Sequence, residues 1–154
     1  MSLAEPAPPA DPRKRVMDLL ARCSADEMRA AWDKIEPKPT FARLREPETG
    51  LVLVRGRMGG GGSPFNLGEA TVSRATIQLT EGTVGHGYRL GTDKVAAEWS
   101  AVFAALWQLP AQQDRVERLL LVPAEERQAE EAARLAHETA ATKVDFFTMV
   151  RGED

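Results

Sequence analysis

The sequence predicts an α+β fold, in which helices cover an antiparallel β-sheet of hairpin-connected strands. Apolar residues follow helical spacing before residue 40 and after residue 92, whereas the segment between is rich in β-branched residues and leucine. A glycine-rich loop and a Glu81-Gly82 turn separate its β-type runs, which predicts hairpins. The 154-residue length suits one domain, which we assign to residues 13–154. It follows an N-terminal segment at residues 1–12 that is rich in Ala and Pro and is expected to be disordered.

Two short helices are expected at the start of the domain. Asp11-Pro12 matches a helix cap followed by a first-turn proline. Ser24 and Glu27 have the spacing of a capping box, which begins a second helix that ends before Pro37. We expect the two to form an N-terminal helical hairpin. Cys23, in an apolar helical pattern, is expected to be buried.

The middle of the chain is predicted to form three strands, at residues 49–58, 66–80 and 83–90. The second changes its apolar phase near Arg74, which indicates a bulge or a bend. Gly85 and Gly87 share one face of the third strand, so a helix can approach that face closely.

Helical spacing returns after these strands. Thr92 is the expected cap of a helix that covers the sheet, and Leu109-Pro110 ends it. Pro123 then opens a long helix to about Lys143, whose apolar stripe is mostly alanine. Alanine buries little apolar area, so this helix is either a close-packed cover or a solvated spacer.

The C-terminal residues 144–150 are predicted to form an extended strand with two apolar faces. Val144, Phe146 and Val150 lie in one phase, and Phe147 and Met149 in the other. Such a strand is either a final core strand or an interface with another chain.

The composition excludes several classes of protein. A formal net charge of −3 gives no broad basic field for nucleic acid or a membrane surface. A single cysteine excludes an internal disulfide and a cysteine-based zinc site. No apolar run is long enough to span a membrane, and we expect a cytoplasmic protein.

The glycine-rich loop is a candidate anion site. Arg57 precedes Gly59 and Gly60, and consecutive glycine N–H groups can surround a phosphate. The segment lacks the lysine and the spacing of a P-loop, so a mobile hairpin loop is the alternative.

Arginines on apolar strand faces need an acidic partner. Arg55 and Arg57 share a face with Leu51 and Leu53. Internal salt bridges are one interpretation for them and for Arg74, and a partner subunit's carboxylate or a substrate phosphate are the others. The candidate internal partners are Glu48, Glu69, Asp93 and Glu98.

No catalytic motif is present. His86 and His137 do not form a metal-ligand set, and His86 is expected to be a hydrogen-bonded core residue. The chain has no ordered Ser–His–Asp set and no HExxH. We therefore expect no catalytic residue and no metal in this chain, and the residues favour a subunit over a free-standing enzyme.

Four segments together resemble the G-subunit family of the carbon–phosphorus lyase system (PhnG). They are residues 48–52 (ETGLV), 57–60 (RMGG), 65–74 (FNLGEATVSR) and 145–152 (DFFTMVRG). The resemblance extends from about Val16 to Gly152.

The resemblance implies a role in organophosphonate catabolism. In that family the G, H, I and J subunits form a core complex. With the H, I and L subunits, G is required to transfer the ribose triphosphate of ATP to a phosphonate, with adenine displaced. ATP is thus a substrate of the complex, and this chain has no cofactor of its own. The iron–sulfur cluster and S-adenosylmethionine belong to the J subunit, which agrees with the absence of a cysteine set here.

We expect this chain mainly to support the catalytic I subunit, through the face around Arg57 and the C-terminal segment. The expected interface residues are Asp145, Phe146, Phe147, Met149, Val150 and Arg151. The alternative is that Arg57, Gly59, Gly60 and Arg74 bind phosphate in a site shared with I. The isolated chain can self-associate through the same uncovered surface.

Overall fold

The computed structural model describes residues 11–58 and 61–141. Most of the N-terminal segment at residues 1–12, and the predicted strand at 144–150, lie outside them. The order along the chain is α1 (Pro12–Leu20), α2 (Ala25–Trp32), β1 (Phe41–Arg57), β2 (Pro64–Leu79), β3 (Val84–Leu90), α3 (Lys94–Trp107), α4 (Pro110–Val116), a π-helical turn (Glu117–Leu121) and α5 (Val122–Ala141). The predicted α+β class, with helices on an antiparallel sheet, is confirmed.

Local capping determines where the first helices begin. The Asp11 carboxylate accepts a hydrogen bond from the N–H of Arg13, and Pro12 occupies the first turn. Ser24 and Glu27 form the predicted capping box, with the Ser24 N–H donating to Glu27 Oε2 at 2.7 Å. α2 ends at Trp32, before Pro37.

The cap of α3 is Asp93, so the prediction of Thr92 was wrong by one residue. Asp93 Oδ1 accepts a hydrogen bond from the N–H of Ala96 at 2.9 Å. Both residue types cap helices, and here it is the carboxylate that reaches an unpaired N–H of the first turn.

The sheet has the order β1-β2-β3, and both pairs are antiparallel. β1 begins at Phe41, earlier than the predicted residue 49, because two register shifts on either side of Arg45 accommodate a charged segment that contains Pro47. These irregularities lie opposite the region of β2 near Arg74 where the apolar phase changes.

α3 packs directly on β3 through the two glycines that the sequence singled out. A Cβ atom on Gly85 would lie 1.9 Å from the carbonyl oxygen of Ala101, and one on Gly87 would lie 1.8 Å from that of Ala97. No side chain fits in either gap, so the predicted close approach is confirmed.

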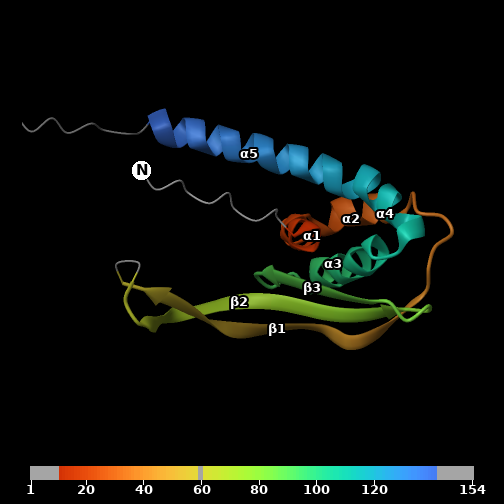
Figure 1. Ribbon diagram of the computed structural model, residues 1–154, viewed down its shortest axis with the longest axis horizontal. Helices are drawn as coiled ribbons and strands as arrows, with labels where there is room; N and C mark the ends of the chain where they lie inside the picture. The colour runs from red at the N-terminus through yellow and green to blue at the C-terminus, as the bar shows by residue number, and fades with distance from the viewer. Residues whose placement is uncertain (1–10, 59–60, 142–154) are drawn as a thin grey trace, which may run out of the picture.

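The core lies between the sheet and the helices (Figure 1). α3 contributes Phe103 and Leu106, and α1 and α2 both contact α3. Cys23 is fully buried, as predicted. In the second half of α5 the side chains from Ala129 to Ala140 are all exposed, so this part is a solvated projection rather than a close-packed cover.

Candidate functional site

The β1–β2 hairpin continues past the rest of the fold. β3 pairs with β2 only from Val72 onward, whereas β1 and β2 remain paired as far as Arg57 and Pro64. Residues 51–57 and 64–71 therefore form a two-stranded ribbon, called the arm below. Figure 1 shows that the arm extends beyond α3 in the same general direction as α5.

Both faces of the arm carry exposed apolar side chains. Leu51 and Leu53, 64% and 62% exposed, lie on the face that α3 covers farther along the sheet. On the opposite face, Leu67 is 62% exposed, and Val54 and Phe65 are exposed as well. An apolar ribbon of two strands is marginally stable in water, so this surface is suited to binding.

The Arg74 guanidinium is held within the chain. Its Nε donates a hydrogen bond to Glu48 Oε1 at 2.7 Å, and Arg45 Nη1 donates to the same oxygen at 2.8 Å. The predicted internal salt bridge is thus present for Arg74. The hydrogen bond from Arg74, and then that from Arg45, keep the pKa of Glu48 below its ordinary value.

Arg55 and Arg57, in contrast, have no acidic partner among residues 11–58 and 61–141. Arg57 Nη1 donates to the carbonyl oxygen of Gly62 at 3.2 Å, and Arg55 makes no ion pair there. Alternation along β1 places both on the face of Leu51 and Leu53, as predicted. Both guanidinium groups therefore keep donors for an external anion.

The candidate phosphate ligands are not gathered at one point. Arg57 is opposite Pro64, and a strand rises about 3.3 Å per residue, which puts Arg74 about 33 Å along β2. Gly59 and Gly60 lie outside the described residues. The N–H of Gly62 donates to the carbonyl oxygen of Met58 at 3.1 Å, and this hydrogen bond joins the two described ends of the loop.

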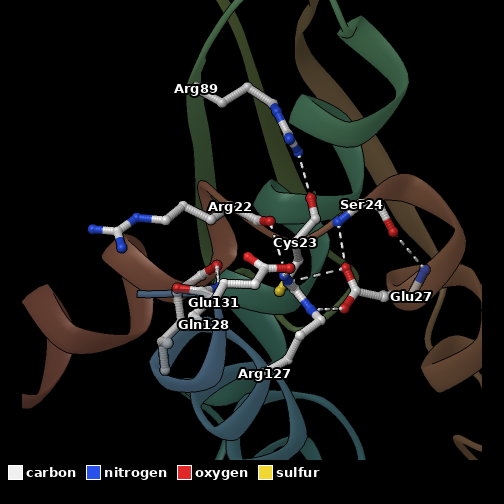
Figure 2. A network of polar contacts seen from close by, with 9 residues as sticks. Arg22, Cys23, Ser24, Glu27, Arg89, Arg127, Gln128 and Glu131 are labelled. Atoms are coloured by element: carbon white, nitrogen blue, oxygen red, sulfur yellow. Dashed lines mark hydrogen bonds and ion pairs between the residues drawn. The ribbon is translucent and has the colours of Figure 1, made fainter. Parts of the chain in front are cut away.

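A polar network that the sequence analysis missed attaches α5 to the turn between α1 and α2 (Figure 2). Arg127 Nε donates to Glu27 Oε1 at 2.6 Å, and Arg127 Nη2 lies 3.3 Å from Glu27 Oε2. Gln128 Nε2 donates to the carbonyl oxygen of Leu19 at 3.2 Å. No local sequence pattern pairs residues so far apart in the chain.

Two groups near this network have shifted pKa values. Burial raises the pKa of Glu27, but the hydrogen bonds from Ser24 and Arg127 outweigh it and leave that pKa below its ordinary value. Burial raises the pKa of the Cys23 thiol to about 11. Arg89 Nη1 donates to the carbonyl oxygen of Cys23 at 2.7 Å, while its buried Nε has no hydrogen-bond partner in the described part of the chain.

The histidines do not form a metal site. His86 is exposed, with its Nδ1 3.2 Å from Thr76 Oγ1, so it is hydrogen-bonded but not a core residue. It lies on the sheet face away from α3, because alternation from the buried Gly85 and Gly87 turns it outward. Over the described ranges, no three His, Cys, Asp or Glu residues are placed to hold a metal ion.

The expected C-terminal interface residues, from Asp145 to Arg151, lie outside the described residues. In the part of the chain that is described, no helix has the length and apolar character needed to cross a membrane.

Comparisons with known proteins agree with the resemblance seen in the sequence. The sequence model of one family, described as phosphonate metabolism protein PhnG, matches residues 11–152. A protein of Rhizobium meliloti (strain 1021) is 58% identical over 142 residues, which cover 92% of this chain and 90% of that protein. It is named alpha-D-ribose 1-methylphosphonate 5-triphosphate synthase subunit PhnG. The chain therefore belongs to the PhnG family of phosphonate metabolism proteins.

Proposed function

We propose that this chain is an assembly subunit of a cytoplasmic synthase that transfers the ribose triphosphate of ATP to a phosphonate and displaces adenine. The proposal relies on the family and on the name of the Rhizobium meliloti relative, which is a subunit of alpha-D-ribose 1-methylphosphonate 5-triphosphate synthase. The observation that carries it is the arm, whose apolar side chains are exposed on both faces. Exposed apolar surface of this kind is typical of a chain that functions in a complex.

The partners proposed are the I, H and J subunits of the carbon–phosphorus lyase core complex, with I in most direct contact. ATP is the substrate of the assembled synthase, which acts with the H and L subunits. The iron–sulfur cluster and S-adenosylmethionine are placed on the J subunit. The contribution that we assign to this chain is to bind and position a partner through the exposed apolar side chains of the arm.

The test is an adenine-release assay with ATP and methylphosphonate. The I-, H- and L-like subunits are combined with and without this chain, and co-purification of the chain with the I-like subunit is measured in parallel. We expect stable co-purification and adenine release only when the chain is present. A chain that neither binds the I-like subunit nor changes the rate would overturn the proposal.

The C-terminal contribution is tested by removing residues 144–154. We expect the shortened chain to stay folded, because the buried residues between Val16 and Ala124 already form a core. Co-purification with the I-like subunit should be lost. A folded, shortened chain that still co-purifies would contradict the assignment of Asp145 to Arg151 to the interface.

A second candidate function is direct binding of the nucleotide's phosphates. It is favoured by the free donors of Arg55 and Arg57. Under this proposal Arg57→Ala weakens nucleotide binding by the complex while assembly survives, and Arg118→Ala, at an exposed arginine on the π-helical turn, has no effect. Unchanged nucleotide affinity in Arg57→Ala would exclude this role.

A further inference from the structure

We propose that the arm inserts into the partner subunit, so that the partner covers both of its faces and pairs its own carboxylates with Arg55 and Arg57. This inference rests on the proposed function, and it specifies the geometry of the contact. The arm would be surrounded by the partner instead of being laid against it.

The first argument is that neither face of the arm is covered within the described residues. Leu51 and Leu53 are exposed on one face, and Val54, Phe65 and Leu67 on the other. A partner that docked on one face would leave the opposite apolar face in water. Burial of both faces removes the whole apolar surface from water, which is the main favourable term in association.

The second argument is that neither edge of the arm is paired with another strand among the described residues. In the sheet order β1-β2-β3, no described residue pairs with the outer side of β1, which is an edge strand over its whole length in this part of the chain. β2 is an edge strand as well over residues 64–71, because its pairing with β3 begins only at Val72. Unpaired backbone N–H and C=O groups on an edge strand are a template for strand addition from another chain.

The third argument is charge. Arg55 and Arg57 lie beside Leu51 and Leu53, and neither forms an ion pair in the part of the chain that is described. Once the leucines are buried, both guanidinium groups are partly desolvated, and a buried cation is costly without a carboxylate. The surface that receives this face therefore presents acidic side chains next to apolar ones.

These features favour a partner subunit over two other occupants. A second copy in a symmetric contact would bring together Arg55 and Arg57 of both arms with only Glu69 of each arm as carboxylate, which leaves cations without a partner. The segment at residues 144–150 has the length of one strand, and one strand covers one face or one edge but not both faces and both edges. A larger chain has the surface to do this.

The test compares the two faces separately, using the full chain and the I-like subunit. The double variants Leu51→Asp/Leu53→Asp and Val54→Asp/Leu67→Asp each place two charges on one face. Insertion predicts that both weaken binding by about 100-fold or more, because each places charges in a desolvated contact. Leu44→Asp, at a residue that is 56% exposed on β1 outside the arm, should bind as the wild type does.

One-sided docking gives a different result, since one double variant would then bind normally, and that outcome overturns the inference. None of the substituted residues belongs to the buried core, so the variants should unfold at the wild-type temperature. If the wild-type chain itself does not bind the I-like subunit, the proposed function fails. If the wild type binds and both double variants bind equally well, only the insertion is wrong.

Charge reversal tests the acidic partner. Arg55→Glu/Arg57→Glu should weaken binding more than about 10-fold, and Arg118→Glu should not. Light scattering of the isolated chain tests self-pairing: a dimer that dissociates in either arm variant would identify a second copy as the occupant and overturn the proposal. A wild-type chain that binds the I-like subunit with no loss in Arg55→Glu/Arg57→Glu would contradict the charge argument.

Discussion

Arg127 of α5 and Glu27 of α2 form a bidentate ion pair, in which Arg127 Nε lies 2.6 Å from Glu27 Oε1 and Arg127 Nη2 lies 3.3 Å from Glu27 Oε2. Both side chains are about one-third exposed. Glu27 also accepts the N–H of Ser24, so a single carboxylate caps α2 and anchors α5.

Glu27→Gln should therefore lower stability and flatten its dependence on pH. Because the pKa of Glu27 is depressed in the folded chain, its contribution is present above the ordinary glutamate pKa of about 4.3 and is lost as pH falls through the folded value. We expect a loss of about 1 kcal/mol at neutral pH, with allowance for solvent screening. Urea unfolding across the acid range measures it, with Glu126→Gln, at an exposed glutamate of α5, as the control. An equal pH dependence in both variants would contradict the prediction.

Gly87→Ala should destabilise the fold by about 2 kcal/mol or more, because the new methyl group would overlap the carbonyl oxygen of Ala97. Gly50→Ala is the matched control: a Cβ atom there meets nothing within 4 Å. Thermal and urea unfolding of the two variants provide the comparison. Similar stabilities would mean that α3 does not pack on β3 as closely as described.

Ser24→Ala should cost about 1 kcal/mol, since it removes the hydroxyl that accepts the N–H of Glu27 at 3.2 Å. Ser63→Ala, in the exposed loop between β1 and β2, should leave the free energy of unfolding unchanged. The difference between the two variants in urea measures the cap. No difference would show that the capping box contributes nothing to stability.

The Cys23 thiol should resist alkylation in the native protein. It is fully buried and its pKa is raised to about 11, so the reactive thiolate is scarce at neutral pH. We expect iodoacetamide to label the chain only after denaturant unfolds it. Rapid labelling of the native chain at a rate close to that of the unfolded chain would refute the burial of this residue.

Features that depend on neighbouring residues were predictable from the sequence. The capping box at Ser24 and Glu27 needs only a three-residue spacing, and the pair Gly85 and Gly87 needs only strand alternation. The start of β1 was missed because its charged first residues and Pro47 do not resemble a strand, and the strand forms there through pairing with β2. Tertiary pairing overrides weak local propensity in such cases.

The candidate site was predicted in part. Strand alternation alone placed Arg55 and Arg57 beside Leu51 and Leu53. The separation of Arg57 from Arg74 follows from the register of a long hairpin, which the sequence does not state. The contact of Arg127 with Glu27 depends on the path of the whole chain between them, so no local pattern indicates it.

The attachment of α5 near its beginning has a mechanical consequence. The part of α5 from Gln128 to Ala141 is a rigid rod about 20 Å long, because an α-helix rises 1.5 Å per residue. A rotation of about 10° about the contact of Arg127 with Glu27 would displace the far end by about 3.5 Å. A small change of angle where α5 meets the turn between α1 and α2 would therefore move the last described residues of the helix by several ångströms.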